Sequence, residues 1–182
     1  PEGREKEILE ELKDKVPPAV FTTPYVNPVS GDPKKTRENL RKAMTLFKEA
    51  GYELKNRKLV NVKTGEPFAI EILLSNPSQE RTVLPYVDAS QYTNRVRSFD
   101  YDMIYGIWAQ TLVPGNEQVD YWGSSSVDQQ GSRNYAGISD PAVDELIRRI
   151  IFAPDRAELV ATVKALDRVL LAHHYVVPMF YS

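Results

Sequence analysis

The chain has 182 residues, with 23 basic and 25 acidic side chains and no cysteine. Balanced charge gives no strong field that would recruit nucleic acid or anionic lipid. The lack of cysteine excludes disulfides, thiolate zinc sites and cysteine nucleophiles. The length suits one domain or one lobe of a larger protein, and no apolar run approaches the length of a membrane span.

The first half of the chain predicts two helices and one hairpin. Apolar spacing marks the helices, while prolines and glycines mark the connections. The expected elements are a helix at 5–15, an extended connection at 19–33, a helix from Thr36 to Gly51, and a hairpin of strands 58–62 and 68–74.

The second half alternates strands and helices, which favours α/β or α+β layering. Asp140 or Ser139, followed by Pro141, is typical of a helix start, and Asp155 with Glu158 resembles a capping box. The expected elements are a helix start at 80–84, a helix at 91–97, a strand at 100–108 covered on both faces, helices from about 140 and 155, and a strand at 175–181.

Two buried stripes follow from helical spacing in the last two helices. The expected core residues are Val143, Leu146, Ile147, Ile150 and Ile151 on the first helix, and Leu159, Val163, Leu166 and Leu170 on the second.

Residues 108–144 carry about thirty positions without helical or strand periodicity, and irregular segments of that length are usually functional. Aromatic, amide and hydroxyl side chains dominate the segment, which suits a surface that holds a polar ligand. No concentrated set of nucleophiles, bases or metal ligands occurs here. The segment therefore favours a binding protein over an enzyme.

Several strings together resemble one protein family. They include FDYDM (99–103), PGNE (114–117), GSRNYAGI (131–138) and ALDRVL (165–170), within a similarity that covers nearly the whole chain. The chain resembles the second, C-terminal lobe of an extracytoplasmic solute-binding protein of a peptide ABC transporter. Within family 5, the peptide/nickel type, the oligopeptide and microcin-C-like branch is most similar.

This resemblance implies an α/β fold, one lobe of a two-lobed type II periplasmic-binding-protein fold with a mixed sheet flanked by helices. Residues 1–182 would form that single lobe, in the periplasm or another extracytoplasmic location. The implied partners are an oligopeptide or peptide conjugate, an inner-membrane ABC permease and the first lobe of the same protein. No cofactor, metal, nucleic acid or catalysis is implied.

Two departures from the family pattern stand out. The family carries roughly fifteen to twenty more residues between Tyr86 and Val87, enough for one strand and its lead-in. Classical oligopeptide binders also have an aspartate after the strand tryptophan, whereas Trp108 is followed by Ala109, Gln110 and Thr111. Recognition of a peptide amine would then fall to Glu117 or Asp120.

The candidate ligand-binding residues combine rings, amides and one guanidinium. Rings can stack on varied ligands, amides can bond a peptide main chain, and arginine can hold a carboxylate. Core packing, turns within the loop and salt bridges are the structural alternatives for the same residues. The candidates are Trp108, Gln110, Thr111, Asn116, Trp122, Arg133, Asn134 and Tyr135, with Tyr121 and Arg95 as further possibilities.

A carboxylate-dependent hydrolase acting on peptide or glycan is the alternative function. Asp100 and Asp102 share one face of the predicted strand, and Glu117 follows in the loop. His173 and His174 close a helix, where histidine favours the dipole, and no third metal ligand lies nearby in sequence. The sequence therefore predicts a receptor, with a hydrolase as the alternative.

Overall fold

The computed structural model describes residues 1–75 and 87–178. The chain divides into two compact units, residues 1–25 with 73–182 and residues 26–72, and each is described by itself. Within the described ranges, no helix combines the length and apolar character needed to cross a bilayer.

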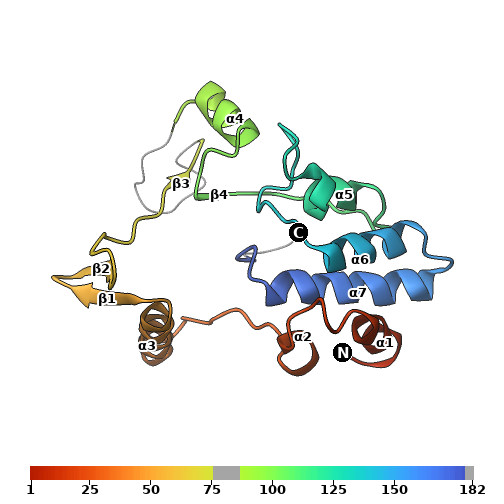
Figure 1. Cartoon of the computed structure of the whole chain (residues 1–182), viewed down its shortest axis with the longest axis horizontal. Helices are drawn as coiled ribbons and strands as arrows, with labels where there is room; N and C mark the ends of the chain where they lie inside the picture. Colours follow the sequence, from red (N-terminus) through yellow and green to blue (C-terminus); the bar gives the residue numbers. More distant parts are fainter. Residues whose placement is uncertain (76–86, 179–182) are drawn as a thin grey trace. The chain divides into compact units, whose positions relative to one another are not determined.

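Helices dominate the first unit. The helix α6 (Pro141–Ile151) lies beside α7 (Arg156–Ala172), and α1 (Gly3–Glu11) and the short α2 (Ala19–Thr22) pack on α7 (Figure 1). Both long helices begin as predicted. The Asp140 carboxylate accepts hydrogen bonds from the amides of Ala142 and Val143, and the Asp155 carboxylate accepts one from the amide of Glu158.

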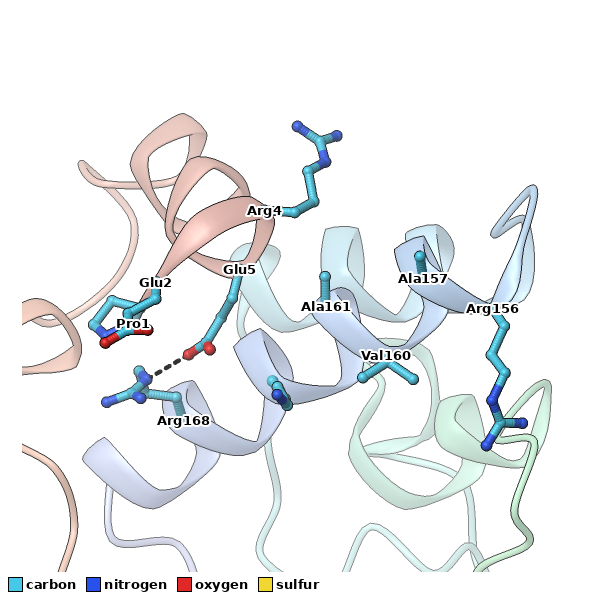
Figure 2. Close-up of a pocket in the computed structure, with 10 residues that line it drawn as sticks. Pro1, Glu2, Arg4, Glu5, Arg156, Ala157, Val160, Ala161 and Arg168 are labelled. Carbon is cyan, nitrogen blue, oxygen red and sulfur yellow. Dashed lines mark hydrogen bonds and ion pairs between the residues drawn. The ribbon is translucent and has the colours of Figure 1, made fainter.

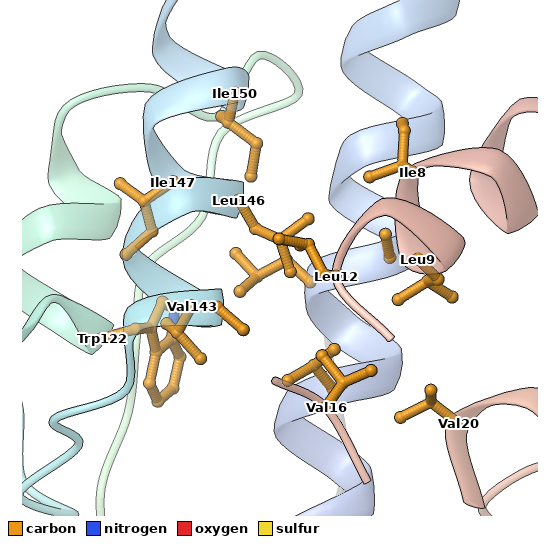
Figure 3. Packing of buried hydrophobic residues seen from close by; sticks show 14 of the residues in the cluster. Ile8, Leu9, Leu12, Val16, Val20, Trp122, Val143, Leu146, Ile147 and Ile150 are labelled. Atoms are coloured by element: carbon orange, nitrogen blue, oxygen red, sulfur yellow. The ribbon is translucent and has the colours of Figure 1, made fainter. Parts of the chain in front are cut away.

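The core of this unit lies between α1, α6 and α7 (Figure 3). Val143, Leu146, Ile147 and Ile150 are buried as predicted, and Ile151 packs at the edge of the cluster. On α7 the fully buried stripe includes Leu166 with Ala165 and Val169, whereas Leu159, Val163 and Leu170 are half-buried. The predicted face of α7 is therefore rotated toward smaller residues, because α1 and α6 both approach this helix.

Two expectations for the first 25 residues were wrong in detail. The first helix ends at Glu11, and residues 12–15 form turns instead of continuing it. The connection at 19–33 is not extended throughout, because α2 forms at its start. Pro17 supplies a carbonyl to the amide of Val20, and burial of the Val20 side chain holds this turn against the core.

The second unit, residues 26–72, contains α3 (Pro33–Glu49) and a hairpin of β1 (Tyr52–Lys55) with β2 (Lys58–Asn61). The helix begins three residues before the predicted Thr36, because Asp32 caps it and Pro33 fits its first turn. None of residues 26–72 is fully buried. Phe47, Tyr52 and Phe68 form its only ring cluster, with centroids 5.2 to 6.4 Å apart.

The predicted hairpin joined the wrong strands. Residues 58–62 pair mainly with β1 through a two-residue turn, Asn56 and Arg57, both at positive φ. Positive φ at both turn residues gives the backbone twist that a two-residue β-hairpin needs. Such turns usually contain glycine, and because this one does not, the sequence pattern did not predict it. The predicted hairpin forms only next to its turn. There Val60 bridges Pro67, the Phe68 amide donates to the Leu59 carbonyl, and the Asn61 amide donates to the Glu66 carbonyl.

The strand predicted at 100–108 is much shorter than expected. Only β4 (Met103–Ile104) forms, and it pairs with β3 (Ile72–Leu73). Burial on both faces is also wrong, since Met103 is 41% and Ile107 is 72% exposed. The helix predicted at 91–97 is confirmed as α4 (Ala89–Arg97), capped by Asp88. The fold is mixed α/β, as predicted, with two two-stranded sheets in the described residues.

Three further expectations concern the remaining segments. The long irregular segment contains a helix, α5 (Glu117–Trp122), followed by one 3₁₀ turn (Ser124–Ser126). Six residues are too few for a periodic pattern to register. Residues 175–178 form no strand, and the rest of the predicted strand lies outside the described residues. The predicted helix start at 80–84 also lies outside them.

An ion-pair network on α6 predicts a pH dependence of stability. Hydrogen bonds from Arg148 and, secondarily, Arg149 lower the pKa of Glu145 to about 2, against the opposing effect of burial. A carboxylate with a depressed pKa stabilises the fold above its ordinary pKa of about 4.3, and this contribution disappears as pH falls toward 2. We expect Glu145→Gln to lower the free energy of unfolding by about 0.5–1 kcal/mol at pH 7.

The difference between Glu145→Gln and the unmodified chain should vanish near pH 2, as measured by urea unfolding across pH. The matched control is Glu49→Gln, because Glu49 is exposed at the end of α3 in the other unit. A difference that persists unchanged at pH 2 would show that Glu145 acts through packing and not through its charge.

Candidate aromatic ligand site

Four rings from three stretches of the first unit, one of them the end of α5, meet in one cluster. The Trp108 ring lies 4.9 Å from that of Trp122 and 5.5 Å from that of Tyr135, measured between centroids. Tyr121 packs edge-on against Trp122 at 6.2 Å. Trp122 and Tyr121 are buried, whereas Trp108 and Tyr135 are half-buried. Of the four residues, the latter two are therefore the more accessible.

Polar atoms of these rings fix the neighbouring main chain. The Trp108 indole donates to the carbonyl of Arg133 at 3.0 Å, and the Tyr121 hydroxyl donates to the carbonyl of Ala109 at 2.9 Å. Burial raises the pKa of Tyr101 to about 12, so its phenol stays neutral and donates to the Tyr135 carbonyl at 3.1 Å. Residues 108–109 are thereby tied to α5 and to the loop at 133–135.

Gly106 makes room for the most exposed of the tryptophans. A Cβ atom at this position would lie 3.2 Å from the Trp108 ring and 3.5 Å from the Tyr135 ring. Larger side chains here would displace the ring or bend the chain. Sequence reasoning did not select Gly106, because an isolated glycine in a predicted strand carries no signal of which ring approaches it.

Residues 106–113 leave much of their main chain and side-chain surface free. Their amides donate no hydrogen bond to another residue in the described ranges, 1–75 and 87–178. Ile107, Leu112 and Val113 are 72%, 93% and 64% exposed. This segment with free amides begins two residues after β4 and includes the half-buried Trp108.

The predicted amide and hydroxyl candidates divide into exposed and internal groups. Gln110, Thr111 and Asn116 are exposed, and Asn116 precedes α5 without capping it through its side chain. The Thr111 hydroxyl donates to the Val113 carbonyl at 2.8 Å. The Gln110 side-chain oxygen accepts from Gln118 at 2.8 Å.

Asn134 is completely buried and uses its amide inside the loop. Its nitrogen donates to the carbonyls of Gly123 and Ile138, and its oxygen accepts from the Ile138 amide at 2.8 Å. The buried Gln118, which sequence reasoning missed, similarly accepts from the Trp122 indole at 3.2 Å. Both amides hold the ring-bearing segments in place.

Arg133 is already engaged by the chain. Its Nε lies 2.9 Å from the Asp120 carboxylate, and its guanidinium carbon lies 4.5 Å from the centre of the Tyr121 ring. The hydrogen bond to Asp120 raises the pKa of Arg133 above its ordinary value. Since the side chain is 43% exposed, part of the guanidinium still faces outward.

Glu117 is held as an anion at the start of α5. Burial raises its pKa, but hydrogen bonds from the amides of Gly115 and Glu117 and from the Gln118 side chain outweigh that effect, so its pKa lies below the ordinary value. The Gly115 amide donates to one carboxylate oxygen at 3.0 Å. No group of three or more metal-binding side chains occurs among the residues that the structure describes.

No protein-family model matches the chain. Several bacterial relatives match essentially all of it. An uncharacterized protein of Sinorhizobium fredii is 60% identical over 197 residues, covering 100% of this chain and 30% of the relative. The probable peptide-binding protein YejA of Agrobacterium fabrum is 57% identical, covering 100% and 32%. The peptidoglycan-binding protein YepA of the same organism is 37% identical, covering 98% and 31%.

The oligopeptide-binding protein AppA of Bacillus subtilis, solved in complex with a nonapeptide, shares the fold. The TM-score is 0.62 at 17% sequence identity, over 95% of this chain and 38% of that one. The chain spans about a third of the length of the curated relatives it matches. The resemblance inferred from the motifs is confirmed: the chain corresponds along its whole length to a segment of these bacterial binding proteins and has the fold of one lobe of an oligopeptide-binding protein.

Proposed function

We propose that this chain is one lobe of a peptide-binding solute receptor and forms one wall of the ligand site. The observation that carries the proposal is the row of main-chain amides at 106–113, beside the aromatic cluster, that donate to no other residue of the described ranges. The peptide-binding relatives and the fold shared with an oligopeptide-binding protein support it. The receptor would act outside the cytoplasm, enclose ligand with the other lobe and deliver it to an ABC permease.

An extended peptide can bind by adding a strand to free main-chain groups, which gives affinity that depends little on sequence. Residues 106–113 would supply the amides, and the outward faces of Trp108 and Tyr135 would contact apolar parts of the ligand. Gln110, Thr111 and Asn116 would add side-chain hydrogen bonds. Their exposure supports this role.

The buried candidates would act by holding this surface in place. Trp122 would support the Trp108 ring from beneath, and Asn134 would fix the loop that accepts the Trp108 indole bond. Arg133 would offer the outward part of its guanidinium to a ligand carboxylate. Its bond to Asp120 orients the group but also neutralises part of its charge.

A peptide amine would be bound by Glu117 in this proposal. Asp120 is paired with Arg133, whereas one oxygen of the ionised Glu117 carboxylate accepts from the Gly115 amide. Hydrogen bonds to Glu117 favour its charged form, which suits attraction of an ammonium group.

No specific observation favours the hydrolase alternative. Asp100 is 67% exposed and lies 2.9 Å from Arg95 in an ion pair. A general acid in a glycosidase needs a raised pKa, whereas that of Glu117 is lowered. We therefore propose a receptor without chemistry of its own.

Calorimetric titration of the 182-residue chain with defined peptides of different length tests the proposal. Because the opposite wall is not part of this chain, we expect weak binding, with a dissociation constant between about 0.1 and 1 mM. Trp108→Ala should weaken binding further, whereas Leu46→Ala, a change in the other unit, should not. Mass spectrometry should recover the peptide uncleaved.

Two outcomes contradict this proposal in different ways. Submicromolar binding by the chain would show that no second wall is needed to enclose the ligand. An absence of heat at millimolar peptide concentration, or cleavage of the peptide, would contradict the receptor function itself.

A further inference from the structure

A second concave surface lies on the opposite side of the helical layer from the aromatic cluster. It is an open groove of about 790 Å³ between the start of α1 and the outward face of α7, and we call it the α1–α7 groove (Figure 2). The helices follow one another in the order α5, α6, α7 and α1, each packed on the next. Two helices therefore separate this groove from the proposed peptide site.

Two ion pairs build the walls of the groove. Arg4 meets the Glu158 carboxylate through two hydrogen bonds of 2.8 and 3.0 Å. Arg168 donates to Glu5 at 2.8 Å (Figure 2). Glu5 is largely shielded, with 13% of its side chain exposed. These pairs join α1 to α7 and engage both carboxylates, so neither Glu5 nor Glu158 is left to pair with Arg156 or Lys164, the other α7 cations at the groove.

Arg156, Val160 and Lys164 form one line along α7 because they stand four residues apart. The two cations are about 12 Å apart along the helix axis. Both are exposed, and neither forms an ion pair with another residue of the described ranges. Val160, 42% exposed, lies between them. The small side chain of Ala161 also lines the groove and takes up little of its space.

We propose that the α1–α7 groove docks an acidic protein segment in which two carboxylates flank an apolar residue. Four residues of extended chain span about 13 Å, which matches the separation of Arg156 and Lys164. The apolar residue between the carboxylates would contact Val160. This docking site is independent of the proposed peptide function and uses none of its residues.

A single phosphate group fits this arrangement poorly, because cations about 12 Å apart cannot converge on one anion. Two cations unpaired within the described ranges would also offer few phosphate contacts to a nucleic acid, whose affinity depends on the number of such contacts. Charge complementarity together with an apolar centre therefore favours a protein segment.

Fluorescence anisotropy with the 182-residue chain tests this docking site. The probe is a labelled peptide in which two glutamates stand four residues apart around a central leucine. The comparison peptide carries glutamines in place of the glutamates. We expect the acidic probe to bind at low salt, and the double variant R156E/K164E to weaken binding about fivefold or more.

The matched control is K6E/K13E, which changes the net charge equally, on α1 and in the turn that follows it, outside the groove. It should change the affinity less than twofold, and Val160→Asp should weaken binding in a chain that still unfolds cooperatively. Equal binding of the glutamine peptide, equal weakening by K6E/K13E, or no binding of the acidic probe overturns the proposal. Tighter binding of single-stranded DNA than of the acidic peptide overturns it in favour of a nucleic-acid surface.

Discussion

Asn134→Ala should destabilise the first unit by about 3 kcal/mol or more and disorder the proposed peptide site. The side chain is fully buried and forms three hydrogen bonds, to the carbonyls of Gly123 and Ile138 and from the amide of Ile138. Alanine leaves these main-chain groups without partners, and each unsatisfied buried group costs about 1–3 kcal/mol. The effects will not add fully, since the loop can relax.

Tryptophan fluorescence during urea unfolding measures this effect selectively. The chain has two tryptophans, Trp108 and Trp122, and both lie in the first unit. The matched control is Asn116→Ala, because Asn116 is exposed and does not cap α5 through its side chain. We expect that control to change stability by less than about 0.5 kcal/mol.

The same pair of variants separates structural from direct roles at the ligand. Loss of peptide binding in Asn134→Ala with a shifted unfolding midpoint identifies Asn134 as a residue that positions the loop. If Asn134→Ala unfolds at the same urea concentration as the unmodified chain, the hydrogen bonds of Asn134 do not stabilise the loop.

Local signals predicted the helices well because they act within a few residues. Asp140 with Pro141 and Asp155 with Glu158 marked two helix starts that the structure confirms. The stripe from Val143 to Ile150 is buried because α6 meets its neighbours along one face. Such short-range information is present in the sequence itself.

Strand pairing and strand burial were harder to predict, because they depend on partners distant in sequence. The turn at Asn56 and Arg57 pairs β1 with β2, whereas the residues after Pro67 looked like an equally good partner for β2. Residues 100–108 have the composition of a covered strand, yet Ile107 is exposed. Composition does not reveal which part of a fold covers a given strand.

The site was predicted in composition but not in organisation. The sequence predicted that these rings could stack on a ligand, whereas in the structure Trp108 packs on Trp122 and Tyr135. Whether a ring or amide faces outward depends on contacts made by residues such as Gln118, whose spacing gives no signal. The ligand-binding roles of these residues stay predictions.

Leu146→Ala is expected to have the other large effect, a loss of about 3 kcal/mol from the free energy of unfolding. Leu146 is completely buried at the centre of the α6 stripe, between neighbours from α1 and α7 (Figure 3). Truncation of a buried leucine to alanine removes apolar burial and leaves a cavity, at a cost of about 2–5 kcal/mol.

Leu112→Ala is the matched control, because the same truncation at a side chain that is 93% exposed should cost less than about 0.5 kcal/mol.

The comparison also tests how the site depends on the core. Trp122 belongs to the same buried cluster as Leu146, and Asp144 on α6 accepts a hydrogen bond from the Ser124 amide just after α5. Because α6 thus supports the rings from below, Leu146→Ala should shift the tryptophan-detected transition and weaken peptide binding together. Leu112→Ala should leave the transition in place, and weakened peptide binding in that variant alone would assign Leu112 to ligand contact. An unchanged transition in Leu146→Ala would mean that the cluster on α6 does not carry the stability of this unit.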